Sequence, residues 1–227
     1  MRLLLDTANL DDIRYFNEYF PICGVTTNPT ILSREGGDVV ARLKEIRSII
    51  GPMKELHVQV TETDYDRILE EARAIVRLLG KNTFAKIPAT DIGLKATSVL
   101  SKEGIDVTVT AILSAVQAML AANAGAAYVA PYVSRLDNIC ADGFETVADI
   151  VDIFAYGDTS TRLLAASFKT AKEVLDVAKV GCDTATVDSD IMKKLLAHST
   201  TDTSIKGFRN DWKNAFGEKT LLQMLDE

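Results

Sequence analysis

The sequence predicts an α/β protein, a (β/α)8 TIM barrel with a C-terminal helical extension. Segments of strand character alternate with segments of helical periodicity, and about eight strands can be counted along the 227 residues. The strands are continuous apolar runs, which is typical of a parallel sheet covered by helices. Eight strand–helix units fit a chain of this length. A doubly wound open sheet is the alternative, but no GxGxxG or GxxxxGKS/T motif follows any strand.

The expected strands are short, apolar and bounded by residues that favour turns. Pro88 stops the fourth strand and Pro131 breaks the sixth, because proline cannot donate to a sheet ladder. The fifth strand is rich in β-branched residues, which suit a sheet. In chain order, we expect strands over Arg2–Asp6, Gly24–Thr27, Leu56–Val60, Thr83–Ile87, Asp106–Thr110, Tyr128–Tyr132, Arg162–Ala166 and Thr184–Val187.

Helices are expected where apolar residues recur at helical spacing after a capping residue. Asn9 and Asp38 cap the first and second long helices, and Asn28-Pro29 opens a short helical turn between them. Thr170 and Ser189 are the expected caps of two later helices, which run to Val180 and to about Ala197. The remaining expected helices are Tyr65–Leu79, Ile92–Glu103, Ser114–Ala124, Glu145–Tyr156 and Asp202–Phe216. Gly80, Gly104 and Gly125 are the expected stops of the first three.

The last expected helix carries an apolar stripe of Ile205, Phe208, Trp212 and Phe216. No linker, low-complexity segment or block of charge marks a domain boundary. We therefore expect one domain over residues 1–227, with residues 202–227 as its C-terminal helical extension. The stripe suits docking on the chain's own barrel or on another subunit, and the sequence leaves both open.

Composition excludes several classes of function. The net charge of −7 argues against a general nucleic-acid binder, which would present a basic face. Only two histidines occur, without a CxxC or HExxH pattern, so no metal site is expected. Three widely spaced cysteines, Cys23, Cys140 and Cys182, suggest reduced thiols in a cytoplasmic protein. The early acidic residue argues against a signal peptide, and no apolar run is long enough to span a membrane.

Lys86 is the most informative single residue because it lies inside an apolar strand. Burial without a partner lowers the pKa of an amine, and a neutral amine is a nucleophile toward carbonyl groups. The alternative is a lysine whose stem packs inside while its ammonium reaches water or a carboxylate. The strand alone leaves both readings open.

Polar residues at the other expected strand ends give Lys86 partners. In a barrel of this type, catalytic groups lie at the carboxyl ends of the strands. Taken singly, several of these residues suit a helix cap or a hydroxyl bonded to the backbone. Together they supply an acid, amides, hydroxyls, a phenol and an amine at one mouth: Asp6, Thr26 with Asn28, Gln59, Lys86, Thr110, Tyr132, Ser167 and Asp188.

This set suits Schiff-base chemistry on a ketose. Lys86 attacks the carbonyl to give an iminium, which is an electron sink that allows the C3–C4 bond to break. Tyr132, Gln59 and Thr110 are positioned to hold a water for proton transfer, and Asp6 to bind hydroxyls or take a proton. An amine of pKa near 10.4 must fall by about three units to be mostly neutral at pH 7, which costs about 4 kcal/mol.

A phosphate site is also expected. Arg135 follows the sixth strand and Ser167 the seventh, and barrel phosphate sites commonly use the late loops. Lys169 lies in the same loop as Ser167, where a substrate role and a solvated role are equally open. Arg135 is alternatively structural, paired with Asp137 in its own loop.

Four separated motifs resemble the transaldolase family, and more closely its small-subunit branch, which includes fructose-6-phosphate aldolase. They are Gly24–Thr30 (GVTTNPT), Ala85–Thr90 (AKIPAT), Tyr128–Asp137 (YVAPYVSRLD) and Ala165–Lys169 (AASFK), and the resemblance extends to Asp211-Trp212. The resemblance implies a barrel that needs no metal or organic cofactor. It also implies a homo-oligomer, a ring of five (pentamer) often doubled to ten (decamer), in which the terminal helix reaches a neighbouring subunit.

By this resemblance, Lys86 forms the Schiff base and Asp6 is the aspartate of the first strand. Asn28 binds substrate hydroxyls, and we place Thr26 beside it as a substrate-binding residue. Thr110 helps to hold the catalytic water. The phosphate-binding pair falls on Arg135 and Ser167.

Two positions bear on the reaction. Transaldolases of the family carry glutamate where this chain has Gln59, and usually phenylalanine where it has Tyr132. The leading expectation is therefore a class I aldolase that reversibly cleaves fructose 6-phosphate to dihydroxyacetone and glyceraldehyde 3-phosphate. The alternative is a transaldolase that moves a dihydroxyacetone unit between sugar phosphates, as in the pentose phosphate pathway. A deoxyribose-phosphate aldolase type of barrel and a sugar-phosphate binding protein without turnover are weaker alternatives.

Overall fold

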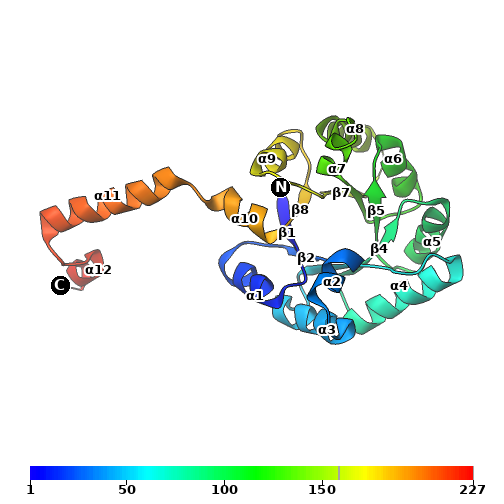
Figure 1. The fold of residues 1–227 in the computed structure, drawn as a ribbon, viewed down its shortest axis with the longest axis horizontal. Helices are drawn as coiled ribbons and strands as arrows, with labels where there is room; N and C mark the ends of the chain where they lie inside the picture. The colour runs from blue at the N-terminus through cyan, green and yellow to red at the C-terminus, as the bar shows by residue number, and fades with distance from the viewer. Residues whose placement is uncertain (158, 227) are drawn as a thin grey trace. The chain divides into compact units, whose positions relative to one another are not determined.

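Eight parallel strands close into a barrel in chain order, with β8 pairing back onto β1 (Figure 1). The computed structural model describes residues 1–157 and 159–226. This confirms the predicted (β/α)8 barrel. The strands are β1 (Arg2–Asp6), β2 (Gly24–Thr26), β3 (Glu55–Gln59), β4 (Thr83–Pro88), β5 (Val107–Ile112), β6 (Tyr128–Pro131), β7 (Arg162–Ala165) and β8 (Thr184–Val187).

Helices follow each strand and surround the barrel (Figure 1). The sequence did not predict α7 and α12. Each spans only five residues, which is too short to show helical periodicity. The helices are α1 (Leu10–Tyr19), α2 (Pro29–Glu35), α3 (Val39–Ile50), α4 (Tyr65–Leu79), α5 (Asp91–Lys102), α6 (Ala115–Asn123), α7 (Val133–Asp137), α8 (Gly143–Tyr156), α9 (Ala171–Lys179), α10 (Ser189–Leu196), α11 (Ser199–Phe216) and α12 (Leu221–Leu225).

Side-chain caps account for most helix starts. The side chain of Asn9 accepts the amides of the first turn of α1, and Thr170 forms a reciprocal capping box at α9. The expected cap at Ser189 is wrong by one residue. Asp188 Oδ1 accepts the amide of Ile191 at 2.9 Å, and Ser189 is already the first residue of α10. An aspartate in extended backbone reaches the third helical amide as well as serine does, so sequence alone does not separate them.

The apolar core has two parts. The larger part lies between the strands and the surrounding helices and includes Leu5, Phe16 and Val25, all fully buried. The smaller part fills the barrel interior and consists of Leu4, Phe84, Tyr128, Ala130 and Leu164. Successive residues of a strand point to opposite faces, which is why Leu4 and Leu5 belong to different parts.

The chain divides into two compact units, Met1–Met192 and Lys193 onward. In the second unit, α11 begins at Ser199, three residues before the expected start, and has no buried residue. Its Trp212 donates from Nε1 to the carbonyl of Lys219 at 2.8 Å and packs its ring 4.7 Å from that of Phe216. Within the described part of the chain, no helix combines the length and apolar character that a membrane span requires.

Candidate active site

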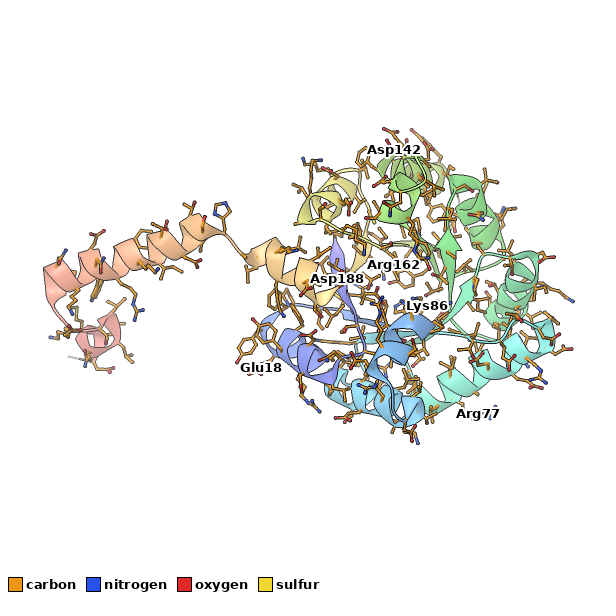
Figure 2. All side chains as sticks on the ribbon, viewed as in Figure 1. Glu18, Arg77, Lys86, Asp142, Arg162 and Asp188 are labelled. Atoms are coloured by element: carbon orange, nitrogen blue, oxygen red, sulfur yellow. The ribbon has the colours of Figure 1, made fainter. Side chains whose placement is uncertain are left out.

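A cavity of about 220 Å³ lies at the carboxyl ends of the strands and collects most of the predicted site. Figure 2 labels Lys86 within the ring of strands and helices. Thr26 and Gln59 are the two predicted residues that do not line this cavity. Those that do line it are Asp6, Asn28, Lys86, Thr110, Tyr132, Arg135 and Ser167.

Lys86 is buried, with 6% of its surface exposed. Its Nζ donates to the backbone carbonyl of Thr27 at 2.9 Å, a neutral partner. Burial lowers the pKa of Lys86, and the Asp6 carboxylate acts in the opposite direction. The amine is therefore shifted toward its neutral, nucleophilic form while still oriented by one hydrogen bond.

Asp6 is held by a threonine pair at the ends of β1, β2 and β8. Thr26 donates from Oγ1 to Asp6 Oδ1 at 2.6 Å, and the Thr26 and Thr186 hydroxyls lie 2.6 Å apart. Burial raises the pKa of Asp6, while Lys86 and the Thr26 hydrogen bond lower it. Thr26 thus contacts the Asp6 carboxylate and does not line the cavity. We expected it to contact the substrate, whereas the structure has it orient an acid.

Thr110 and Tyr132 form one wall of the cavity. Thr110 Oγ1 and the Tyr132 hydroxyl lie 3.4 Å apart, and Thr110 is almost fully buried. The strand register shifts between Thr110 and Ile112, where Ala111 has a φ of 58°. Such a bulge redirects the side chains on either side of it, and non-glycine residues rarely adopt this backbone conformation.

Arg135 lies on α7 with its guanidinium 4.5 Å from the centroid of the Tyr132 ring. Asp137 accepts the amide of Gly143 at 2.9 Å, and no ion pair joins it to Arg135 in the residues described. The structural alternative for Arg135, an ion pair with Asp137, is therefore absent. The guanidinium keeps its donors available to the cavity.

Ser167 also has a left-handed backbone, with a φ of 63°. Its carbonyl accepts the amide of Ser134 at 2.9 Å, and the following loop is fixed by Glu173, which accepts the amide of Lys169 at 2.6 Å. Backbone strain of this kind persists only when the surroundings hold it. The loop thus presents Ser167 and Lys169 together to the cavity.

Asn28 and Gln59 differ in how they approach the site. Asn28 caps α2 by accepting the amide of Ile31 at 3.0 Å, and it also lines the cavity. Gln59 is the register neighbour of Lys86 on the adjacent strand, so both side chains emerge on the inner face of the barrel. Gln59 is half-buried and lies beside the cavity, not in its wall.

A second polar group occupies the opposite end of the barrel interior, where the strands begin. We call this group, Arg2, Glu55, His57 and Tyr128, the amino-end cluster. Glu55 accepts from Arg2 at 2.8 Å and from the Tyr128 hydroxyl at 3.1 Å. His57 lies 3.4 Å from Glu55 through Nε2 and 2.8 Å from the Thr108 hydroxyl through Nδ1. Its ring stacks on Phe84 with centroids 4.4 Å apart.

Burial would raise the pKa of Glu55, but hydrogen bonds from His57 and Arg2 lower it to about 2. Burial lowers the pKa of His57 to about 4 although Glu55 opposes this. At neutral pH the cluster therefore holds an ionised carboxylate and a neutral imidazole. No part of it lines the cavity around Lys86.

Sequence reasoning missed the amino-end cluster and, among the polar cavity residues, Arg34 and Thr186. The signal for the cluster is present in the sequence, because β1, β3 and β6 begin with the polar residues Arg2, Glu55 and Tyr128. Arg34 lies on α2 after the GVTTNP segment and lines the cavity. Among residues 1–157 and 159–226, no group of three or more His, Cys, Asp or Glu side chains is arranged to hold a metal ion.

Comparisons with known proteins agree with this geometry. A family model described as Transaldolase/Fructose-6-phosphate aldolase matches residues 3–225. A probable transaldolase of Clostridium acetobutylicum is 43% identical over 219 residues, covering 96% of this chain and 100% of the relative. A probable transaldolase of a Thermoanaerobacter species is 44% identical over 216 residues, covering 95% and 98%.

Solved structures match in fold. A crystal structure of a mandelate oxidase variant superposes with a TM-score of 0.58 at 12% identity, covering 84% of this chain and 66% of that one. At this identity the likeness concerns the barrel architecture alone. The family model spans nearly the whole chain, and the match covers 100% and 98% of the two relatives. The chain therefore belongs to the transaldolase/fructose-6-phosphate aldolase family.

Proposed function

We propose that this protein is a Schiff-base (class I) enzyme that breaks and forms the C3–C4 bond of ketose phosphates. Membership of the family gives transaldolase- or aldolase-type activity. The observation that carries the proposal is Lys86, a buried amine with a lowered pKa and a neutral carbonyl partner. Small sugar phosphates are its substrates.

In the first step, the neutral Lys86 amine adds to C2 of the ketose. The resulting carbinolamine loses water, with the proton supplied by a neighbouring acid, and leaves an iminium. Asp6 is suited to this exchange because burial raises its pKa toward the working range. Asn28 and the Asp6 carboxyl bind the substrate hydroxyls near C3 and C4.

In the second step, the C4 hydroxyl loses its proton and the C3–C4 bond breaks. The bonding electrons move into the iminium, so the products are an enamine on Lys86 and a free aldehyde. Thr110 and Tyr132 hold the water that relays the proton, with Gln59 beside Lys86 on the adjacent strand. Arg135 and Ser167 bind the phosphate, as their positions on late barrel loops support.

The enamine then has two possible fates, and different observations favour each. Protonation at C3 followed by hydrolysis releases dihydroxyacetone and makes the protein a fructose 6-phosphate aldolase. The phenol of Tyr132 at the cavity wall favours this outcome because it is a proton donor. Attack of the enamine on an acceptor aldehyde makes the protein a transaldolase, which the printed names of its relatives favour.

One assay separates the two candidates. The protein is incubated with fructose 6-phosphate alone, and free dihydroxyacetone is measured. Steady release at enzyme turnover supports the aldolase. Turnover that requires added erythrose 4-phosphate supports the transaldolase and rejects the aldolase.

A trapping experiment tests the covalent step shared by both. Dihydroxyacetone and borohydride should add one reduced three-carbon unit to Lys86, located by peptide mass spectrometry. The exposed Lys44, outside the cavity, is the internal control and should stay unmodified. An unmodified Lys86 in protein that still binds the sugar phosphate would mean binding without turnover.

We also propose that the protein works in the cytoplasm as a single catalytic domain with residues 202–227 as its extension. The family resemblance supports a homo-oligomer of five or ten chains. The exposed apolar side chains of α11, such as Phe208 and Phe216, support its use in such an assembly. Sedimentation equilibrium measures the stoichiometry, and a monomer at micromolar concentration would contradict the proposal.

A further inference from the structure

Arg34 faces the cavity that holds Lys86, yet no step of the proposed reaction uses it. It lies on α2, three residues after Ile31, and both side chains line the cavity from one face of the helix. Asn28 caps the same helix with its own side chain. The position of Arg34 is therefore tied to a residue of the proposed substrate site.

Arg34 makes no hydrogen bond or ion pair within residues 1–157 and 159–226. Three of the acids nearby are already engaged. Asp188 accepts an amide of α10 at 2.9 Å, Glu35 lies 3.5 Å from an arginine of α3, and Asp6 accepts from a threonine of β2 at 2.6 Å. Most other arginines of the chain do have such partners: Arg2, Arg14, Arg42, Arg47, Arg67, Arg73 and Arg162.

The barrel topology places Arg34 across the mouth from Lys86. A neighbouring cavity of about 300 Å³ is lined by Arg34 together with five acids. Two of them mark the strands: Asp6 ends β1 and Asp188 follows β8. Arg34 thus lies over the β8–β1 side, and in a closed ring of eight strands β8 is opposite β4, which carries Lys86.

Two further cations extend from this side around the mouth. Lys169 follows β7, Arg135 follows β6, and both line the same cavity as Arg34. We call Arg34, Lys169 and Arg135 the cationic arc. The wall of this cavity carries these three cations and Lys86 against two carboxylates, Asp6 and Asp188. Three more acids, Asp12, Glu35 and Asp190, line the neighbouring cavity. In a protein of net charge −7, the wall of the cavity that holds the reactive amine thus carries more cations than carboxylates.

We propose that Arg34 is a specificity-determining residue that binds the phosphate of phosphorylated substrates together with the rest of the cationic arc. This inference rests on the proposed Schiff-base function. A substrate fixed at Lys86 by a covalent bond extends across the mouth, so its distal phosphate reaches the arc. A guanidinium without a protein partner supplies up to five donors to phosphate oxygens. The class selected is phosphorylated aldehydes and ketoses over the same sugars without phosphate.

The test compares two acceptors that differ only in the phosphate. The kcat/KM for addition of dihydroxyacetone is measured with glyceraldehyde 3-phosphate and with glyceraldehyde. In Arg34→Gln the ratio of the two values should fall about tenfold, the scale of a hydrogen bond to a charged group. Arg34→Lys should restore part of the ratio. The matched control, Lys44→Gln, removes an exposed cation outside the cavity and should leave the ratio unchanged.

An unchanged ratio in Arg34→Gln would overturn the inference, as would an equal loss with both acceptors. Failure of the proposed function looks different. In that case wild-type protein adds dihydroxyacetone to neither aldehyde and borohydride leaves Lys86 unmodified. The role of Arg34 is then tested by calorimetry, which measures the affinity for glucitol 6-phosphate, a ligand that cannot form a Schiff base. Glucitol, which lacks the phosphate, is the control ligand. About tenfold weaker binding in Arg34→Gln supports the inference, and equal affinity overturns it.

Discussion

The barrel interior carries charged side chains at both ends, and the two ends differ in how those charges are satisfied. In the amino-end cluster, Glu55 accepts from Arg2 and Tyr128 and is joined by the His57 ring. At the mouth, the one hydrogen-bond partner that Lys86 has among the described residues is a backbone carbonyl. The amine is therefore held ready to react, while the carboxylate of Glu55 is held ionised and inert.

The amino end of the barrel interior therefore contributes to stability, and the mouth at its carboxyl end carries the reactive group. A satisfied buried network strengthens the fold only while it stays complete, because removal of one member leaves the others unpaired. A buried group without a charged partner costs stability and gains reactivity. We expect changes at the mouth to alter turnover and changes in the amino-end cluster to alter unfolding.

The largest effect is expected from Lys86→Met. Schiff-base formation should be abolished, with a loss of turnover above about 10⁴-fold, because the nucleophile is gone. Borohydride trapping and the fructose 6-phosphate assay measure this. The same variant should unfold at a temperature equal to or higher than wild type, since a methionine avoids burying an amine.

The pH dependence of stability provides the control for this variant. The folded pKa of Lys86 lies below its unfolded value, so the unfolded state binds more protons and wild-type stability falls as pH drops below the unfolded pKa. Lys86→Met should lose that slope. A variant markedly less stable than wild type at neutral pH would contradict the comparison.

Glu55→Gln should give the next largest effect, on stability. The substitution removes the charge that Arg2 and His57 surround, at a cost of about 3 kcal/mol in the free energy of unfolding. Urea denaturation followed by circular dichroism measures it. Borohydride trapping of Lys86 at a temperature where the variant is folded should match wild type. The control is Glu18→Gln, which removes a carboxylate outside the amino-end cluster and should leave the free energy of unfolding close to wild type. Figure 2 labels Glu18 at the rim of the barrel.

Acid denaturation gives a second reading of Glu55. Its folded pKa of about 2 lies below the unfolded value, so its stabilisation is present above the unfolded pKa and is lost as pH falls toward 2. In Glu55→Gln this part of the acid transition should disappear. Equal acid profiles for wild type and variant would show that the carboxylate is not held as the structure indicates.

Tyr132→Phe should lower turnover and leave the free energy of unfolding unchanged. If the phenol protonates the enamine, release of dihydroxyacetone from fructose 6-phosphate should fall about 100-fold, in line with loss of a general acid. Transfer to erythrose 4-phosphate should fall less, because it needs no proton at C3. Equal losses of activity in both assays would show that the Tyr132 phenol does not determine whether the enamine is protonated or transferred. Tyr156→Phe, at an exposed tyrosine, is the matched control.

The smallest effect is expected at His57. Burial holds the folded pKa at about 4, below the unfolded value, so wild-type stability should fall as pH drops from about 6.5 to 4. His57→Phe keeps the stack on Phe84 and removes the titration, so the variant should retain the stability that wild type loses to protonation across this range. Denaturation at pH 4.5 and 7 measures the difference. His198→Phe, outside the barrel unit, should retain the wild-type slope.

The sequence predicted the barrel and most of the mouth for a physical reason. Parallel strands of a closed barrel bring their carboxyl ends together, so a residue such as Asp6 or Lys86 is placed by its strand alone. Thr26 shows the limit of that reasoning. It ends a strand as expected, but its hydroxyl is used by Asp6.

Other features depend on geometry that strand ends do not encode. Arg34 reaches the cavity through α2, whose path follows from the cap at Asn28. Arg2 and Glu55 are 53 positions apart and meet because β1, β2 and β3 start at one end of the barrel. The helix that carries Arg135 is too short to leave a periodic pattern.

The hydrogen bond from Lys86 to the carbonyl of Thr27 has a consequence for stereochemistry. A neutral amine has two N–H groups, and an iminium formed from it keeps one. We expect that remaining N–H to continue to donate to Thr27, so that the nitrogen is prevented from rotating while carbon bonds change. One face of the three-carbon enamine would then always be turned toward the incoming aldehyde. A single backbone oxygen would then help to set the configuration at C3 of the sugar.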